Sequence, residues 1–337
     1  MRAVICPAYG PPEVVRIEDR PAPALESGQV RVRVGAAAVN FPDVLVIAGE
    51  YQIKVPTPFV PGSEFAGTVA ETADDITEFA IGDRVTGTGI VGAFAEEVAV
   101  PAAGLGRIPD GVDDQCAAAF GVAYRTAYHT LRSVARVQPG NRLLVLGAGG
   151  GVGLAAVQLG VHLGAEVTAV ASSAEKLSAA AAYGATELID YTSGDLRAAL
   201  KQALPDGAHA VIDPVGGRLS EPTLRSLRRG GRFVTVGFAS GEIPRIPLNL
   251  VLVKGIHVSG FQFQDLDPAE FRRNEDELRE LLTTGRVLPH ISAVYPLTEA
   301  AAALRQVADG QAIGKILLDP NASSVTTTPV GRQSKSC

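Results

Sequence analysis

A run of glycines near the middle of the chain is the segment best suited to bind a ligand. Residues 147–153 read Gly-Ala-Gly-Gly-Gly-Val-Gly and follow an apolar segment, residues 143–146. They lead into residues 151–163, which are typical of a buried helix. A helix that begins at such a turn presents unpaired N–H groups and a partial positive charge at its amino terminus. The segment therefore predicts an anion-binding turn between a strand and a helix.

The spacing of these glycines is close to the G-x-G-x-x-G of dinucleotide sites but does not match it. Ala148, Gly150 and Gly153 occupy the three glycine offsets, so alanine replaces the first glycine. Gly150 would let the backbone approach a pyrophosphate, and Gly153 would let the helix pack closely on the strand. The alternative is a flexible glycine loop, which does not require a strand before it and a helix after it.

The residues after the next expected strand indicate which nucleotide the turn selects. A site for NAD normally ends this strand with an acid that holds the ribose 2′-hydroxyl. Here Ala171 is followed by Ser172 and Ser173, and then by Lys176. Hydroxyls and an ammonium are available to bind a 2′-phosphate and no carboxylate repels it, which favours NADPH. The alternative is that Lys176 is only a solvated residue in the first turn of a helix.

The elements that hold this turn alternate between short apolar strands and helices from Arg142 onwards. Alternation of this kind predicts a parallel sheet with helices on both faces. We expect strands at residues 143–146, 167–171, 188–189, 210–212 and 233–236, and helices at residues 151–163, 174–183, 196–204 and 219–227.

The first third of the chain has a different pattern. Valines alternate with arginines at residues 30–34, and short apolar runs are separated by Pro- and Gly-rich turns. This pattern is typical of a small, partly open barrel. We expect strands at residues 30–34, 65–69, 84–86, 94–100 and 316–318, and helices at residues 124–131, 271–282 and 297–307.

Several separated motifs carry a resemblance to one family. They are Val39–Asp43, Pro61–Gly67, Gly82–Val85, the glycine turn, Ile189–Tyr191, Asp213–Gly217 and Gly314-Lys315. Over residues 1–318 the chain resembles the medium-chain dehydrogenase/reductases, and among them the zinc-free, zeta-crystallin-like quinone oxidoreductases. The resemblance implies an α/β protein with a GroES-like, partly open β-barrel catalytic domain and a Rossmann cofactor domain with a doubly wound parallel sheet. We expect the barrel at residues 1–123, the Rossmann domain at 124–262, a return to the barrel at 263–320 and a disordered tail at 321–337.

The zinc-containing members of this superfamily hold the catalytic metal with a Cys, a His and a second Cys. At the matching positions this chain has Asn40, Ser63 and Val122. An amide, a hydroxyl and an isopropyl group do not make a tetrahedral site for zinc. The three cysteines, Cys6, Cys116 and Cys337, are also too far apart in sequence for metal-knuckle spacing. We therefore expect no metal and no alcohol oxidation.

Without a metal, the chemistry implied is hydride transfer from NADPH to a quinone or to the β-carbon of an α,β-unsaturated carbonyl. The resemblance places Asn40 and Thr126 near the nicotinamide amide and ribose, and Tyr51 in the substrate cleft. It places Gly151 and Val152 at the pyrophosphate and Tyr191 over the adenosine phosphate beside Lys176. The remaining residues that the resemblance places at the cofactor are Gly237 and Phe238 with Phe261 on the nicotinamide side, and Lys315 near the phosphate end.

Some of these residues have simpler explanations. Asn40 could make a turn or cap a helix. Asp43 is expected to bond backbone N–H groups, and Glu64 to be buried with a basic partner that the sequence does not identify. Tyr51 could be a packed aromatic in a loop, but it is also the nearby phenol able to donate a proton to a developing oxyanion.

Two other functions stay open: an enoyl-thioester reductase of the acryloyl-CoA type, and an NADPH-binding protein without catalytic activity. The net charge of −6 weighs against a nucleic-acid partner. The cysteine usage favours the cytoplasm. The amino terminus lacks the apolar core of a signal peptide, and the uncharged stretch at 143–165 contains too many glycines for a membrane span. We expect a homodimer in which residues 257–261 pair as an edge strand.

Overall fold

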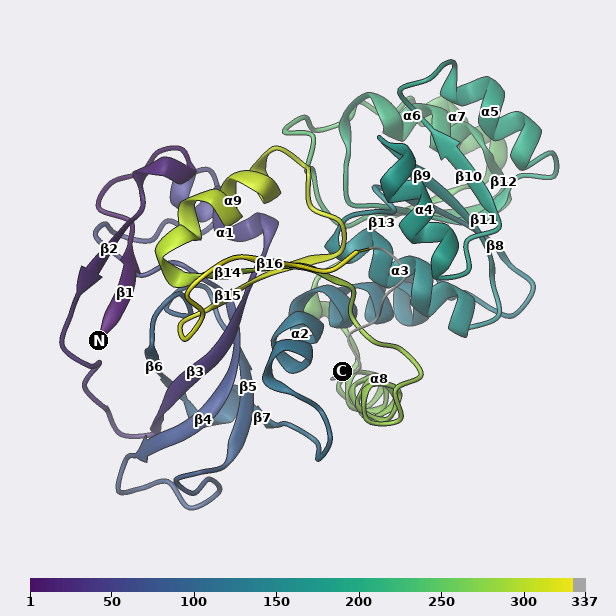
Figure 1. The fold of residues 1–337 in the computed structure, drawn as a ribbon. Helices are drawn as coiled ribbons and strands as arrows, with labels where there is room; N and C mark the ends of the chain where they lie inside the picture. The colour runs from purple at the N-terminus through teal and green to yellow at the C-terminus, as the bar shows by residue number, and fades with distance from the viewer. Residues whose placement is uncertain (330–337) are drawn as a thin grey trace. The chain divides into compact units, whose positions relative to one another are not determined.

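The computed structural model describes residues 1–329, and the chain divides into two compact units (Figure 1). The first unit joins residues 1–122 to the segment that begins at Leu288, and the second spans Ala123–Val287. The division falls inside helix α2, Asp114–His129, which a short π-helical turn, Thr130–Val134, prolongs. Residues 330–337, the end of the expected tail, lie outside the described residues.

The first unit is built around an eight-stranded sheet. Seven strands follow the order β16-β14-β15-β3-β4-β5-β7, and β6 pairs with β3 off this path. The strands are β3 (Gln29–Val39), β4 (Glu64–Thr72), β5 (Arg84–Thr88), β6 (Glu97–Pro101), β7 (Leu105–Arg107), β14 (Ile291–Pro296), β15 (Lys315–Asp319) and β16 (Thr326–Thr327). The smaller elements are β1 (Arg2–Ile5) paired with β2 (Arg16–Asp19), helices α1 (Phe41–Ala48) and α9 (Ala300–Ala308), and 3₁₀ turns at Pro12–Val14, Ala102–Gly104 and Leu297–Glu299.

The alternation of residues 30–34 explains the central strand of this sheet. Val30, Val32 and Val34 are buried, while Arg31 and Arg33 point to the other face. On the other side of β3 from β4, the late strand β15 pairs antiparallel with residues 37–39. The segment after Leu288 therefore completes the sheet, because without β15 the carboxyl-terminal end of β3 would be an open edge.

The second unit contains a six-stranded parallel sheet in the order β10-β9-β8-β11-β12-β13. Its strands are β8 (Arg142–Leu146), β9 (Glu166–Ala171), β10 (Glu187–Asp190), β11 (Ala208–Asp213), β12 (Leu227–Thr235) and β13 (His257–Gly260). Its helices are α3 (Gly151–His162), α4 (Ala174–Ala182), α5 (Leu196–Ala203), α6 (Ser220–Arg225), α7 (Leu248–Lys254) and α8 (Pro268–Thr283), with 3₁₀ turns at Gly217–Leu219 and Phe263–Asp265. From the centre of the sheet, β8, β9 and β10 follow one another toward one edge, and β11, β12 and β13 follow one another toward the opposite edge. This reversal at β8 and β11 is the switch point of a doubly wound sheet, where ligands bind at the carboxyl ends of the strands.

The structure differs from the sequence expectations in several elements. Helix α2 begins at Asp114 instead of residue 124, because the alanine-rich segment 116–120 favours helix. The helix expected at 219–227 ends at Arg225, since Leu227 pairs with Ala208 in the sheet. Helices α1 and α7 were not expected from the sequence as helices. In the expected tail, Thr326–Thr327 form strand β16 against β14.

Helix α8 belongs to the second unit, which extends beyond the boundary expected at residue 262. Its polar residues bond to α2 within the same unit. Glu275 accepts from His129 Nε2 at 2.7 Å and pairs with Arg125 at 2.9 Å, and the Tyr128 hydroxyl donates to Glu277 at 2.6 Å. His129 is fully buried and stacks on Phe271. These contacts hold a helix whose charged sequence alone gives no sign of its partner.

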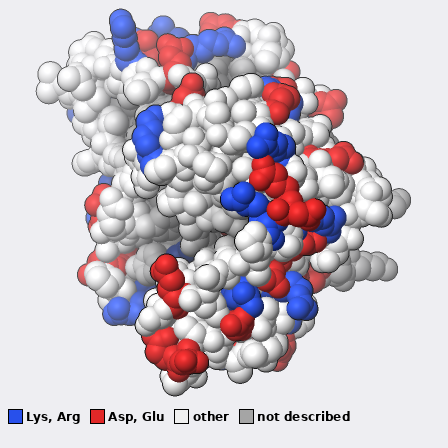
Figure 2. Space-filling model, turned by 90° about the vertical axis from the view of Figure 1, so that its left-hand side faces the viewer, with Lys and Arg blue, Asp and Glu red and all other residues white. Residues whose placement is uncertain are grey.

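The described surface agrees with the mixed charge of the sequence. On the face shown in Figure 2, acidic and basic side chains are interspersed, without a broad basic patch of the kind that a nucleic acid requires. No helix within residues 1–329 is long and apolar enough to cross a membrane.

Candidate functional site

The glycine turn lies at the carboxyl end of β8, at the switch point of the parallel sheet. Gly147 has φ +59°, the left-handed conformation that favours glycine, and Gly150 precedes the first residue of α3. A Cβ on Gly153 would lie 2.0 Å from the carbonyl oxygen of Gly147, so only glycine allows α3 to approach the turn. Ala148 is tolerated at the first glycine offset because the left-handed residue is its neighbour, Gly147. The packing role expected for Gly153 is therefore confirmed.

The loop after β11 supports this turn. The buried carboxylate of Asp213 accepts from the N–H groups of Val215 and Gly216, at 2.9 and 2.8 Å, and from the hydroxyl of Ser220 at 2.6 Å. A Cβ on Gly147 would meet Val215 at 2.8 Å, so this loop lies directly against the glycine turn. Sequence reasoning found the Asp213 motif but gave it no role.

Lys176 and Ser172 lie beside the glycine turn. The stem of Lys176 is so close that a Cβ on Gly149 would lie 2.5 Å from it, and its ammonium donates to Ser172 Oγ at 3.1 Å. Burial lowers the pKa of Lys176. Ser173 caps α4 by accepting from the N–H of Lys176 at 3.3 Å. The structure thus brings together the hydroxyl and the ammonium that the sequence suggested for a 2′-phosphate, at the end of a strand that has no acid.

The structure adds one residue that sequence reasoning missed. The guanidinium of Arg218 lies 5.8 Å from the ring centroid of Tyr191, which follows β10. Arg218 stands in the segment after Asp213-Pro214-Val215-Gly216-Gly217, so this motif was the available signal. Tyr191 and Arg218 supply an aromatic face and a cation near the carboxyl ends of β9 and β10.

The other predicted residues of the second unit lie at its carboxyl edge or on α2. Gly237 and Phe238 follow β12, and a Cβ on Gly216 would lie 2.8 Å from the Phe238 ring. Phe261 follows β13 and packs edge-on against Phe263, with ring centroids 4.9 Å apart. Thr126 is half-buried on α2. The contacts expected between these residues and a nicotinamide stay predictions.

A buried polar cluster in the first unit contains Asn40, Glu64 and Lys315. Lys315 donates to Asn40 Oδ1 at 2.5 Å and lies 3.3 Å from Glu64 Oε2, while Asn40 Nδ2 donates to the same carboxylate at 3.0 Å. Glu64 is fully buried and Lys315 is 3% exposed. Lys315 is therefore the basic partner of Glu64 that the sequence left open, and its expected place near a phosphate stays a prediction. The amide of Asn40 is fixed, with its oxygen toward the ammonium and its nitrogen toward the carboxylate.

The backbone around Asn40 confirms its other interpretation, a helix cap. Asn40 precedes α1, and its N–H donates to the carboxylate of Asp43 at 2.8 Å. Asp43 thus bonds a backbone N–H, as expected. Burial raises the pKa of Asp43 to about 7, against the opposing effects of the Ser63 hydroxyl, the Asn40 N–H and the Lys315 charge. Tyr51 follows α1 and lies half-buried against the core of this unit, so its expected role as a proton donor stays a prediction.

The positions that correspond to zinc ligands converge on Glu64. Asn40 Nδ2 lies 3.4 Å from Ser63 Oγ, and the N–H of Val122 donates to Glu64 Oε1 at 2.5 Å. A Cβ on Gly121 would lie 2.6 Å from the same oxygen, so glycine allows this approach. The cluster contains an ammonium and no thiolate or imidazole, and these residues do not fit a zinc ion. Within residues 1–329 no group of three His, Cys, Asp or Glu side chains lies close enough to hold a metal.

Comparison with known proteins identifies the family. Residues 26–110 match the alcohol dehydrogenase GroES-like domain, and residues 151–280 match the zinc-binding dehydrogenase domain. A quinone oxidoreductase-like protein 2 homolog from Nematostella vectensis is 38% identical over 94% of this chain and 88% of its own. A mycobacterial protein solved with NADPH superimposes with a TM-score of 0.88, at 29% identity, over 95% of this chain and all of its own. The quinone oxidoreductase of Escherichia coli, also solved with NADPH, gives 0.87 at 26% identity over the same shares.

The chain belongs to the medium-chain dehydrogenase/reductases, and within them to the zinc-free quinone oxidoreductases. It is therefore an oxidoreductase that combines a GroES-like unit with a Rossmann unit. The family and fold expected from the sequence motifs are confirmed.

The raised pKa of Asp43 predicts how stability depends on pH. The ordinary pKa of an aspartate is 3.8, so the folded protein holds this proton more tightly than the unfolded chain. The resulting stabilisation is complete below pH 3.8 and is lost as the pH rises through about 7. Asp43→Asn keeps an oxygen acceptor for the Asn40 N–H and removes the titration. Relative to the wild type, this variant should gain about 2 kcal/mol in free energy of unfolding between pH 5 and pH 7, measured by urea denaturation.

The control is Asp74→Asn, which neutralises an exposed acid of the same unit. The difference in free energy of unfolding between this control and the wild type should be the same at pH 5 and pH 7. If the corresponding difference for Asp43→Asn were also constant, Asp43 would already be ionised at pH 5.

Proposed function

We propose that the chain is an NADPH-dependent, metal-independent reductase of quinones or other α,β-unsaturated carbonyl compounds. The observation that carries this proposal is the glycine turn with Lys176 and Ser172 beside it, at the end of a strand without an acid. This arrangement favours a nucleotide with a 2′-phosphate. The two structural neighbours that were solved with NADPH support the same cofactor.

The described residues fit the cofactor. The N–H groups of Gly150, Gly151, Val152 and Gly153 at the start of α3 would hold the pyrophosphate, helped by the partial positive charge of the helix terminus. Lys176 and Ser172 would bind the 2′-phosphate by charge-assisted hydrogen bonds. We assign Tyr191 and Arg218 to the adenosine side. The nicotinamide side is assigned to Thr126, Gly237, Phe238, Phe261 and Asn40, and Lys315 is assigned to orient Asn40 and not to contact a phosphate.

When bound, NADPH supplies the hydride equivalent, and the protein supplies orientation and electrostatics. A quinone or an enone is already electrophilic at the accepting carbon, so it does not require a metal to polarise it. The negative charge that develops on its oxygen does require a proton or a hydrogen bond. We assign this donation to the Tyr51 hydroxyl. General acid catalysis of this kind typically raises a reaction rate by about 10²–10⁴-fold.

The Lys315–Glu64–Asn40 cluster would act in this reaction by orientation. Because Lys315 and Glu64 hold opposite ends of the Asn40 amide, this side chain cannot rotate to exchange its oxygen and nitrogen. A fixed amide presents the same hydrogen-bonding edge in every turnover, which favours a single bound orientation of the substrate or cofactor.

Lys176→Ala tests the choice of cofactor. The variant should bind NADPH about 10- to 100-fold more weakly, because a charged hydrogen bond to the 2′-phosphate is lost, and its affinity for NADH should stay the same. Fluorescence titration measures both dissociation constants. Arg272→Ala, which removes an exposed cation from α8, should change neither. A wild-type protein that binds NADH as tightly as NADPH would contradict the proposal.

The acceptor is tested by following NADPH absorbance with a naphthoquinone, an alkyl enone and acryloyl-CoA. We expect NADPH to be oxidised with the quinone or the enone. In Tyr51→Phe, the rate of NADPH oxidation with the enone should fall by about 10²-fold or more. A preference for acryloyl-CoA would identify a thioester reductase. NADPH binding without oxidation by any of the three would identify a non-catalytic binding protein. Near-normal turnover in Tyr51→Phe would exclude the tyrosine as the donor.

We also propose that two copies of the chain pair through β13. This strand lies at one edge of the parallel sheet, and Val258 on it is 42% exposed. Leu252 and Val253 of the neighbouring helix α7 are also exposed. An open edge beside exposed apolar side chains is a surface that another strand can cover.

Light scattering should give the mass of a dimer for the wild type and of a monomer for Val258→Asp, which places two like charges across the two-fold axis. Leu188→Asp is the matched control, because Leu188 has similar exposure on β10 at the opposite edge. It should remain dimeric. A monomeric wild type would exclude the pairing.

A further inference from the structure

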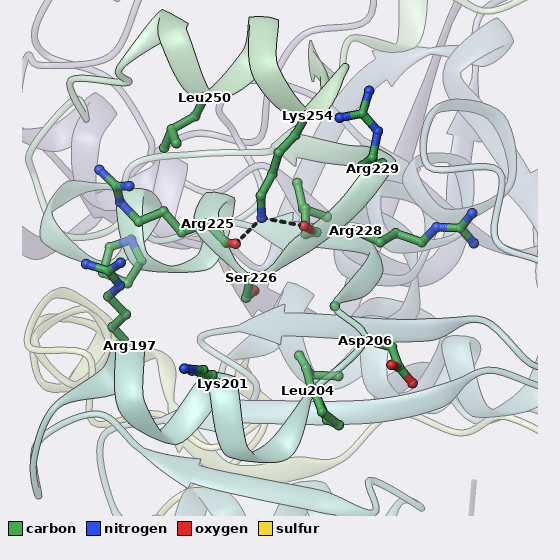
Figure 3. Close-up of a pocket in the computed structure, with 14 residues that line it drawn as sticks. Arg197, Lys201, Leu204, Asp206, Arg225, Ser226, Arg228, Arg229, Leu250 and Lys254 are labelled. Atoms are coloured by element: carbon green, nitrogen blue, oxygen red, sulfur yellow. Dashed lines mark hydrogen bonds between the residues drawn. The ribbon is translucent and has the colours of Figure 1, made fainter.

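A cavity lies in the second unit, away from the glycine turn. It has a volume of about 520 Å³ and is lined by α5, α6 and α7, by the loop that leads into β11 and by the start of β12 (Figure 3). Because all six strands of the sheet are parallel, the cavity lies at the amino ends of the strands and the glycine turn at their carboxyl ends. A ligand in this cavity would therefore not occupy the cofactor site.

Positive charge dominates the lining of this cavity. Six of its 14 residues are basic and only one, Asp206, is acidic, although the chain as a whole has a net charge of −6. The basic residues are Arg197, Lys201, Arg225, Arg228, Arg229 and Lys254. Such a concentration in an acidic protein is unfavourable unless something compensates the repulsion between the cations.

The protein itself compensates little of this charge. Arg225 pairs with Glu221 at 2.6 Å. Within the described part of the chain, Arg197, Lys201 and Arg228 form no ion pair, and the guanidinium of Arg229 donates only to the carbonyl of Val253. Several positive charges therefore remain without a carboxylate partner.

Lys254 is bonded to two backbone carbonyls of the cavity wall. It reaches inward from α7 and donates to the carbonyl oxygens of Arg225 and Leu227, the second at 2.8 Å (Figure 3). Carbonyl groups orient the ammonium but do not neutralise it, and they leave its third N–H available. Burial and the charge of Arg225 lower the pKa of Lys254, because both disfavour its charged form. A bound anion would offset this effect by stabilising the ammonium.

The two basic residues of α5 are arranged to act with Lys254. Arg197 and Lys201 are four residues apart, so they lie on the same face of the helix. Figure 3 shows them on the α5 side, below the Lys254 ammonium, with the Arg225 side chain of α6 extending to the left of that ammonium. The buried side chains of Leu204 and Leu227 add an apolar part to the wall.

We propose that this cavity binds a small molecule that carries two adjacent phosphate groups. Cations contributed by three helices can contact more than one phosphate, and guanidinium and ammonium groups are the usual phosphate ligands in proteins. The volume of about 520 Å³ falls within the range of small-molecule pockets. The apolar wall would contact the organic part of such a ligand.

Calorimetric titration of the full chain with inorganic pyrophosphate tests the proposal. The wild type should bind one equivalent at this cavity, besides any that binds at the glycine turn, and Arg197→Gln/Lys201→Gln should bind it at least about tenfold more weakly, because two charged contacts are lost. Arg272→Gln/Arg273→Gln, which removes two exposed cations from α8, is the matched control and should bind like the wild type. Lys176→Ala should also bind like the wild type.

Each of the other outcomes would overturn the proposal. Equal affinity in Arg197→Gln/Lys201→Gln, or no binding by the wild type at millimolar pyrophosphate, would show that the cavity is not a phosphate site. Loss of binding in Lys176→Ala would place the pyrophosphate at the glycine turn. Equal affinity for citrate would show attraction to anions in general. Because these readouts do not use NADPH, they hold whether or not the proposed reduction is correct.

Discussion

The buried ion pair between Lys315 and Glu64 is the contact on which the first unit depends. Two charges removed from water are stable only if each finds several compensating partners. Glu64 receives the Lys315 ammonium, the Asn40 amide and the Val122 N–H. Through these contacts one carboxylate joins the start of β4, the residue before α1, the middle of α2 and the start of β15. The same cluster fixes the amide of Asn40, and its Lys315 charge opposes the rise that burial causes in the pKa of Asp43, so fold and site share one set of interactions.

The sequence predicted the parts of the molecule in which neighbours along the chain also interact. The glycine turn, the alternation of β3 and the strand–helix rhythm of the second unit are local patterns, and each was found. Lys315 could not be identified as the partner of Glu64, because 251 residues separate them and nothing nearby indicates the pairing. The placement of α8 was also missed, since His129 and Glu275 meet only after folding. The start of α2 differs for another reason, because the expected helix covered only residues 124–131 and left out the alanine-rich segment 116–120 before it.

The second unit has positive charge at both ends of its parallel strands, and the charge has a different origin at each end. At the carboxyl edge the positive character comes mainly from a helix terminus and from Lys176, in a setting of small residues that leaves the backbone open. At the amino ends of the strands it comes from long side chains on α5, α6, α7 and the start of β12. The first arrangement is rigid because Gly147, Gly153 and Asp213 restrict it. The second depends on long arginine and lysine side chains, of which Lys254 is bonded to two backbone carbonyls and Arg229 to one.

The interrupted course of the first unit has a consequence for its biosynthesis. Residues 123–287 form the whole second unit and leave the ribosome before β15 does. The nascent chain can therefore close its Rossmann sheet while the barrel still lacks the strand that seals β3. Until Lys315 emerges, Glu64 has no cation to neutralise it and is kept hydrated. An incomplete chain that stalls between the two events would expose an open strand edge, the kind of surface that chaperones protect.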